Sequence, residues 1–185
     1  MIPSPHPLPD PDLERRAARI QWLLLDVDGV LTDGRLRYTE RGEEMKVFHV
    51  RDGLGVRMAQ RAGLTVGVLS GRSGPALERR ARELDLDPLI VGSKHKVADL
   101  ERFCDERGTT PDSIAYVGDD LQDLGVLRRC GLAFAPADAA TEVRDVVHHV
   151  LRTAGGRGAV RELVETLLRA RGEWDRILAG YLDGD

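Results

Sequence analysis

Short runs of apolar residues alternate along the chain with stretches in which apolar positions recur every three or four residues. The first run, Ile20–Asp26, is apolar almost throughout, as expected of a strand covered on both faces of a sheet. Similar but shorter runs predict further strands at 64–70, 89–91, 114–117 and 132–135. Helical spacing predicts helices at about 53–62, 75–85, 95–107, 120–129, 139–146 and 158–171.

This alternation of strands and helices predicts an α/β fold. Strands joined by single helices through short connections form right-handed crossovers, which give a parallel sheet with helices on both faces. We therefore expect a three-layer, Rossmann-like domain over residues 13–175. Five of the nine prolines lie in the first eleven residues, so we interpret residues 1–12 as a disordered tail. Residues 176–185 are expected to form a C-terminal tail.

Residues 34–50 interrupt the alternation and have the pattern of an inserted hairpin. Leu36 and Tyr38 alternate with polar residues, a glycine supplies a turn, and Met45 and Val47 alternate again. An isolated two-stranded ribbon is marginally stable in water, so its apolar face needs a surface to pack on. Because the chain shows no second sheet to receive the ribbon, we expect self-association. The alternative is a hairpin folded back on its own domain.

Composition narrows the classes of partner. The chain has 185 residues, and 42% of them are apolar, which is enough for the core of one domain. A net charge of -4 disfavours nucleic acid and anionic membranes as partners. No run approaches the roughly 20 apolar residues of a membrane span, and Cys104 and Cys130 lack the spacing of a zinc site. Since the first residues also lack the features of a secretory signal, we expect a cytoplasmic protein.

Polar side chains gather at the ends of the predicted strands, where open parallel sheets bind their ligands. Asp26 and Asp28 end the first strand, and Thr32 and Asp33 follow them. Later strands are followed by further polar groups: Ser70, Arg72, Lys96, Asp119, Asp120 and Asp123. Carboxylate oxygens are ligands for Mg²⁺, and hydroxyl and cationic groups bind phosphate oxygens. The set therefore predicts a metal-assisted phosphoryl-transfer site.

The chain turns directly after the first two aspartates, which separates their expected roles. Asp26 is expected to face the phosphorus, attack it as a nucleophile and give an aspartyl-phosphate. Asp28 is expected near the leaving oxygen, first as a general acid and then as a general base. Asp119 has the position to complete the metal site, and Ser70 and Lys96 would bind phosphate oxygens.

These motifs resemble those of the haloacid dehalogenase superfamily of phosphatases. The matching residues are Asp-x-Asp-Gly-Val-Leu-Thr-Asp-Gly at 26–34, Ser-Gly-Arg at 70–72, Lys96, and Gly-Asp-Asp-x-x-Asp at 118–123. Segments 48–55 and 155–159 resemble the branch without a cap domain that contains the 3-deoxy-D-manno-octulosonate 8-phosphate phosphatases. Ser70 stands where threonine is common and keeps the hydroxyl group. Spacing favours Lys96 over Lys94 as the motif lysine.

The resemblance implies a Mg²⁺-dependent phosphatase of a sugar-acid phosphate. In such enzymes the metal is held by the first Asp side chain, the backbone carbonyl of the third motif residue and a later Asp. These correspond to Asp26, Asp28 and Asp119. The resemblance also implies a homotetramer, in which the hairpins form a central barrel and neighbouring chains close the active site.

Further side chains are expected around this centre. The resemblance further implies that Arg51, Arg72 and Arg157 meet the carboxylate and hydroxyls of the substrate, and guanidinium groups suit a carboxylate through their planar fork. Arg157 lies in a Gly-rich stretch that is expected to be flexible, so that it could reach a neighbouring site. The remaining residues expected to bind substrate, or to support the metal ligands from behind, are Thr32, Asp33, Asp120 and Asp123.

Three alternatives stay open at this point. The substrate could be a sialic-acid-like 9-phosphate instead of the octulosonate 8-phosphate. A non-catalytic relative would use the same fold to bind a sugar acid or to steady a biosynthetic partner. A phosphoacceptor receiver domain also pairs carboxylates with a hydroxyl and a lysine. It would place its acidic pair before a separate phosphorylated Asp, whereas here an acidic cluster follows the lysine.

Overall fold

The computed structural model describes residues 10–42 and 44–183. Within them, a six-stranded parallel sheet has the strand order β5-β4-β1-β6-β7-β8. Its strands are β1 (Trp22–Leu25), β4 (Thr65–Leu69), β5 (Leu89–Ile90), β6 (Ile114–Val117), β7 (Leu132–Ala135) and β8 (His149–Val150). β1 lies in the middle, paired with β4 on one side and β6 on the other.

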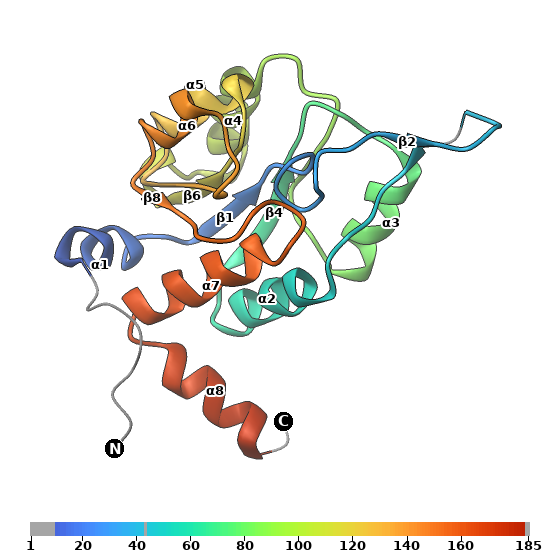
Figure 1. The fold of residues 1–185 in the computed structure, drawn as a ribbon. Helices are drawn as coiled ribbons and strands as arrows, with labels where there is room; N and C mark the ends of the chain where they lie inside the picture. The colour runs from blue at the N-terminus through green and yellow to red at the C-terminus, as the bar shows by residue number, and fades with distance from the viewer. Residues whose placement is uncertain (1–9, 43, 184–185) are drawn as a thin grey trace.

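Helices cover both faces of this sheet (Figure 1), which confirms the three-layer α/β fold. One face carries α1 (Pro11–Ala17), α2 (Val50–Arg61), α3 (Pro75–Glu83) and α7 (Ala159–Ala170). The other face carries α4 (Lys96–Arg107), α5 (Leu124–Leu127) and α6 (Thr141–Arg144). Leu23 and Leu25 of β1 enter the first core and Leu24 enters the second. Because both faces are buried, the strand is apolar up to its end.

The predicted hairpin is present and projects away from the domain (Figure 1). It consists of β2 (Arg37–Tyr38) and β3 (Glu44–Met45), paired antiparallel. The register sets Arg37 opposite Met45 and Tyr38 opposite Glu44. Since opposite residues share a face, the apolar side chains are divided between the two faces, which corrects the expectation of a single apolar face. Exposure is 49–58% for the four large apolar side chains of the ribbon, Leu36, Tyr38, Met45 and Val47.

Several element boundaries differ from those predicted. α2 begins at Val50 and not near residue 53, because Nδ1 of His49 caps it by accepting a hydrogen bond from the backbone N–H of Arg51 at 3.2 Å. The helices predicted at 120–129 and 139–146 are shorter, as α5 and α6. β8 is not predicted, because its two residues, His149 and Val150, do not form an apolar run.

The predicted C-terminal tail needs correction, because residues Trp174–Asp183 form α8. Ile177 on this helix is buried in the core. The guanidinium of Arg61 lies 5.0 Å from the centre of the Tyr181 ring, at cation–π distance. Contacts along the helix therefore stabilise it in spite of Gly180.

The end of the predicted N-terminal tail, residues 1–12, also needs correction. Residues 1–9 lie outside the described residues, but Pro11 already begins α1, and Oδ1 of Asp10 accepts a hydrogen bond from the N–H of Asp12 at 2.9 Å. Proline is well suited to the first position of a helix, which explains why the last proline of the series starts one. In the described part of the chain, none of the helices has the length and apolar character needed to cross a bilayer.

Candidate active site

The C-terminal ends of β1, β4 and β6 bring together most of the polar residues singled out in the sequence. β1 ends directly before Asp26, β4 ends directly before Ser70, and β6 ends two residues before Asp119. The chain runs from β1 to β4 and β5 on one side of the sheet, then crosses to β6, β7 and β8 on the other. Such a switch point is where open α/β sheets form their ligand sites.

Asp26, Asp119 and Asp123 form a cluster of carboxylates in which one oxygen from each lies within 4.8 Å of the others. Oδ2 of Asp26 and Oδ1 of Asp119 are buried and accept no hydrogen bond. Buried carboxylate oxygens without partners are costly, and a hard divalent cation would satisfy them. The donor set therefore fits Mg²⁺.

Asp123 differs from the other two because hydrogen bonds satisfy both of its oxygens. Oδ1 accepts from Nζ of Lys96 and from the hydroxyl of Tyr116, each at 2.6 Å. Oδ2 accepts from the backbone N–H groups of Asp119 and Asp120, at 3.1 and 3.3 Å. Asp123 thus fixes the loop that carries Asp119, which matches a supporting position and leaves it no free oxygen for a cation.

Lys96 places a positive charge within this cluster. Its Nζ lies 3.0 Å from Oδ1 of Asp26 as well as contacting Asp123. Burial disfavours the charged form, but the two carboxylates more than offset it and raise the pKa of Lys96, so the ammonium stays protonated. Lys94, the competing candidate, is exposed.

One lysine does not balance three carboxylates. Burial, followed by repulsion from Asp123, raises the pKa of Asp26 to about 6. Burial and the carboxylates of Asp26 and Asp123 raise the pKa of Asp119 to about 8. A divalent cation would favour the ionised form of both groups, so the excess negative charge is a second reason why the cluster fits one.

The carboxylate of Asp28 lies outside the acidic cluster. Its Oδ1 contacts Nζ of Lys46, which follows β3, and its Oδ2 lies 3.6 Å from Nε of Arg72. The carboxylate of Asp28 therefore does not belong to the cation-binding cluster. The metal contact expected for Asp28, through its backbone carbonyl, stays a prediction. Lys46 carries no motif signal, so sequence reasoning misses it.

The Gly-rich stretch before α7 packs against the loop that follows β1. The N–H of Gly156 donates to the carbonyl of Val30 at 2.9 Å, and the N–H of Gly155 donates to Oδ1 of Asp138 at 2.9 Å. A Cβ atom on Gly155 would lie 1.8 Å from the carbonyl oxygen of Gly29. The glycines therefore permit a close approach of two backbones. The expected reach of Arg157 into a neighbouring site stays a prediction.

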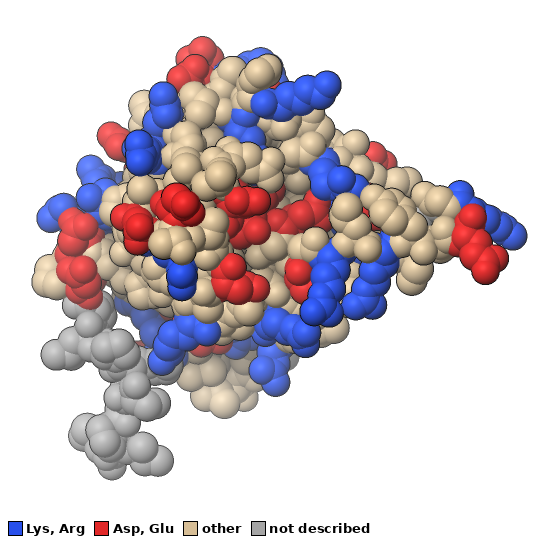
Figure 2. All heavy atoms as spheres, turned by 45° about the horizontal axis from the view of Figure 1, so that its top comes forward, with Lys and Arg blue, Asp and Glu red and all other residues tan. Residues whose placement is uncertain are grey.

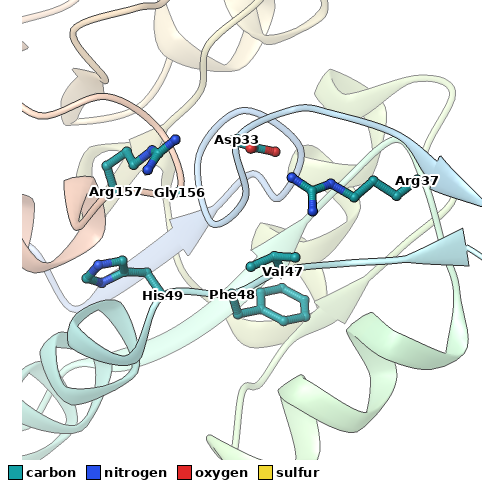
Figure 3. A pocket seen from close by; sticks show the side chains of 7 residues that line it. All are labelled: Asp33, Arg37, Val47, Phe48, His49, Gly156 and Arg157. Atoms are coloured by element: carbon teal, nitrogen blue, oxygen red, sulfur yellow. The ribbon is translucent and has the colours of Figure 1, made fainter.

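A cavity of about 210 Å³ lies beside this loop. Figure 3 shows Arg157, from the Gly-rich stretch, and Arg37, from the hairpin, on opposite sides of it, with Asp33 between them. Its other walls are formed by Val47, Phe48, His49 and Gly156. Two guanidinium groups at one cavity suit an anionic ligand. Arg37 is not among the residues predicted from the sequence, because an arginine in an exposed ribbon gives no distinctive signal.

Two predicted hydroxyl groups are buried in the loops that follow β1 and β4. Oγ1 of Thr32 lies 3.3 Å from the carbonyl of Val27, to which it donates, and so closes the loop after β1. Ser70 is 1% exposed, and its Oγ accepts from the backbone N–H of Arg72 at 3.3 Å. Thr32 therefore serves the loop itself, whereas Ser70 retains its hydroxyl proton for a ligand.

The remaining predicted residues lie further out. Arg51 is exposed in the first turn of α2, and Arg72 forms an ion pair of 2.9 Å with Glu44 of the hairpin. Asp120 caps the turn after β6 by accepting from the N–H of Leu121 at 2.7 Å. Figure 2 shows acidic side chains gathered near the middle of one face, with basic side chains beside them at the base of the hairpin. This charge pattern suits a cation together with an anionic substrate.

A doubly wound sheet that ends in such an acidic cluster, with a buried lysine against the first aspartate, is the arrangement of haloacid dehalogenase-type phosphatases. The chain matches no family model. It is, however, 43% identical over 161 residues to the 3-deoxy-D-manno-octulosonate 8-phosphate phosphatase KdsC of Haemophilus influenzae, a match that covers 87% of this chain and 89% of that protein. The chain therefore belongs to the KdsC family of haloacid dehalogenase-type phosphatases.

Solved structures support this assignment. The 3-deoxy-D-manno-octulosonate 8-phosphate phosphatase of Moraxella catarrhalis, in complex with magnesium, phosphate and KDO, superposes with a TM-score of 0.89 at 34% identity, over 92% of this chain and 98% of that one. The cobalt-bound phosphatase of Haemophilus influenzae gives a TM-score of 0.85 at 42% identity, over 90% and 99% of the two chains.

Proposed function

We propose that this protein is a Mg²⁺-dependent phosphatase that hydrolyses 3-deoxy-D-manno-octulosonate 8-phosphate. The observation that carries the proposal is the acidic cluster at the end of β1, with its two buried oxygens that accept no hydrogen bond. The choice of substrate is supported by the relatives, which are phosphatases of this sugar-acid phosphate.

The cation would be held by the free oxygens of Asp26 and Asp119, together with the backbone carbonyl of Asp28. When bound, Mg²⁺ supplies positive charge to the phosphate oxygens and screens the carboxylates from them. Ser70 and Lys96 are the chain's own groups for phosphate. Lys96 lies 3.0 Å from Asp26 and also holds that carboxylate in place.

Two displacements at phosphorus complete the reaction. In the first, a carboxylate oxygen of Asp26 attacks the phosphorus, the bond from phosphorus to the sugar oxygen breaks, and Asp28 gives that oxygen a proton. In the second, water attacks the phosphorus of the aspartyl-phosphate and gives a proton to Asp28. The bond between phosphorus and Asp26 then breaks, which releases phosphate and restores both carboxyl groups.

The sugar acid would occupy the cavity beside the Gly-rich stretch. Its carboxylate is suited to the guanidinium groups of Arg157 and Arg37, and Asp33 can accept hydrogen bonds from sugar hydroxyls. Arg51 and Arg72 do not line this cavity and would add positive charge along the path by which the substrate enters it. A nine-carbon 9-phosphate is not favoured as substrate, since the matching relatives act on the octulosonate.

The assembly that we propose is a homotetramer formed through the hairpins. Four large apolar side chains, divided between the two faces of the ribbon, have about half of their surface exposed, and exposed apolar surface of this kind marks protein contacts. A second copy of the chain would cover them. Neighbouring chains would then close the cavity, whose wall includes Arg37 and Val47 of the same hairpin.

The test is phosphate release from the octulosonate 8-phosphate, a sialic-acid 9-phosphate and glucose 6-phosphate, with Mg²⁺ and after chelation by EDTA. We expect the highest kcat/KM with the octulosonate and none without the metal. Asp26→Asn should abolish turnover, whereas Asp105→Asn, on the exposed side of α4, is the matched control that keeps it. If none of the three substrates is hydrolysed with Mg²⁺, the proposal is wrong.

A further inference from the structure

Four charged groups form a closed ring between the hairpin and the end of β1. Oδ1 of Asp28 contacts Nζ of Lys46, and the same Nζ lies 2.9 Å from Oε1 of Glu44. Oε2 of Glu44 lies 2.9 Å from Nη2 of Arg72, whose Nε lies 3.6 Å from Oδ2 of Asp28. Each cation of this charge ring thus meets both carboxylates.

The two cations of the charge ring differ in burial. The side chain of Lys46 is 4% exposed, whereas that of Arg72 is 43% exposed. A buried ammonium needs carboxylate partners, and Lys46 has two of them. Of the two, Lys46 also makes the direct contact with Asp28. The orientation of the Asp28 carboxylate therefore depends mainly on Lys46.

Asp26 and Asp28 are two residues apart, and each contacts a different lysine. Lys96, at the start of α4, lies against Asp26, and Lys46, on the hairpin, lies against Asp28. The Asp28 carboxylate is thereby turned away from the acidic cluster and toward the hairpin. The cavity proposed for the sugar is lined by the same hairpin, so the oxygen that leaves phosphorus would lie on this side.

We propose that Lys46 is a positioning residue for proton transfer: it holds the Asp28 carboxylate beside the leaving oxygen of the substrate. The inference rests on the proposed function and assigns a role to a residue that belongs to none of the phosphatase motifs. Glu44 supports this positioning, because its carboxylate contacts both cations of the charge ring, Lys46 and Arg72.

The test compares two leaving groups in Lys46→Met. A sugar alkoxide needs a proton as it leaves, whereas p-nitrophenolate leaves as a stable anion. The value of kcat/KM reports the step in which the leaving group departs. We expect kcat/KM for the octulosonate 8-phosphate to fall at least tenfold more than kcat/KM for p-nitrophenyl phosphate. Lys46→Arg should recover part of the difference, because it restores a cation beside Asp28.

Controls separate this role from support of the fold. Lys94→Met removes an exposed lysine and should leave the ratio of the two kcat/KM values as in the natural protein. If Lys46→Met does not fold, as judged by its unfolding midpoint in urea, Lys46→Gln removes the charge and keeps a polar group. An equal fall in kcat/KM for both substrates would overturn the inference.

A wrong substrate assignment would give a different result: the natural protein would hydrolyse p-nitrophenyl phosphate but not the octulosonate 8-phosphate. The two leaving groups would then be compared with an alkyl phosphate that the protein does hydrolyse, such as glycerol 3-phosphate, in place of the octulosonate. The inference for Lys46 is overturned if Lys46→Met then reduces kcat/KM equally for alkyl and aryl phosphates.

Discussion

Gly29 and Asp119 lie so close together that a Cβ atom on Gly29 would be 2.0 Å from Oδ2 of Asp119. Gly29 also has a φ of +87°, in the region that side chains other than glycine disfavour. The contact joins the loop after β1 to the loop after β6. It therefore sets the position of the Asp119 carboxylate relative to Asp26.

Gly29→Ala should weaken metal binding through this contact. The methyl group would displace Asp119, so we expect the Mg²⁺ concentration for half-maximal activity to rise at least tenfold. Gly63→Ala is a matched control, because Gly63 has a φ of +86° and no atom within 4 Å of its Cβ position. Both variants should lose about 1–2 kcal/mol of stability from backbone strain. Equal Mg²⁺ dependence in the two would contradict the prediction.

Removal of Lys96 should destabilise the protein most strongly when the metal is absent. Lys96→Met leaves the buried carboxylates of Asp26 and Asp123 without their cation, and loss of one partner of a buried pair costs about 3–5 kcal/mol. Added Mg²⁺ should recover part of that loss. Urea unfolding with EDTA and with Mg²⁺ measures both values. Lys94→Met is exposed and should change stability by no more than about 0.5 kcal/mol.

The metal-free protein should lose stability as the pH rises from about 4 toward about 8. The pKa values of Asp26 and Asp119 are raised in the folded state to about 6 and about 8, from 3.8, so the folded state binds more protons across this interval. Stability is fully present below the unfolded value and is lost as each group ionises. Urea unfolding in EDTA at several pH values measures the slope.

Mg²⁺ should remove most of this pH dependence, because it favours the ionised carboxylates. In the absence of metal, Asp119→Asn should make the free energy of unfolding depend less on pH. The substitution replaces the group with the higher pKa by one that does not titrate. A metal-free protein whose stability rises between pH 5 and pH 8 would show that the carboxylates are balanced by charges other than those described.

Much of the fold follows from local pattern. β1, β6 and β7 are apolar runs of four residues, which are recognisable in the sequence, whereas β8 has two residues and depends on its pairing with β7. The hairpin is recognisable by alternation, but its register depends on the length of its loop, and the register decides which side chains share a face.

The residues of the candidate site also fall into two groups: those that the sequence identifies and those whose contacts depend on tertiary packing. Asp26, Lys96 and Asp119 follow strand ends at motif spacing, and parallel topology brings those ends together. Lys46 and Asp52 have partners that no spacing rule identifies, because tertiary packing creates the contacts. Lys46 meets Asp28 across the base of the hairpin, and Asp52 meets α7 from the neighbouring helix.

Asp52 should affect substrate binding through α7. It is 1% exposed, and its Oδ1 accepts from the backbone N–H of Arg161 at 2.8 Å, where the helix lacks a side-chain cap of its own. Asp52→Ala should cost about 1–3 kcal/mol by leaving that donor unpaired. Because the Gly-rich stretch with Arg157 leads into α7, we expect KM for the octulosonate to rise more than kcat falls.

Asp52→Asn is the matched variant for this prediction. It keeps an oxygen acceptor for the N–H of Arg161, so both the stability and KM should stay closer to the natural protein than in Asp52→Ala. A loss of kcat with unchanged KM in Asp52→Ala would contradict a role through the substrate cavity. Urea unfolding and steady-state kinetics on the same preparations give both readouts.

Assembly of the protein should depend on both faces of the hairpin. The register places Tyr38 on one face and Met45 on the other, with 58% and 53% of their surfaces exposed. We expect Tyr38→Ser combined with Met45→Ser to shift the sedimentation coefficient toward smaller assemblies, because burial of each apolar side chain contributes about 1.5–3 kcal/mol. Leu182→Ser, at a position 79% exposed on α8, is the control that should leave the assembly intact. If the double variant sediments as the natural protein does, the ribbon is not the surface through which the copies associate.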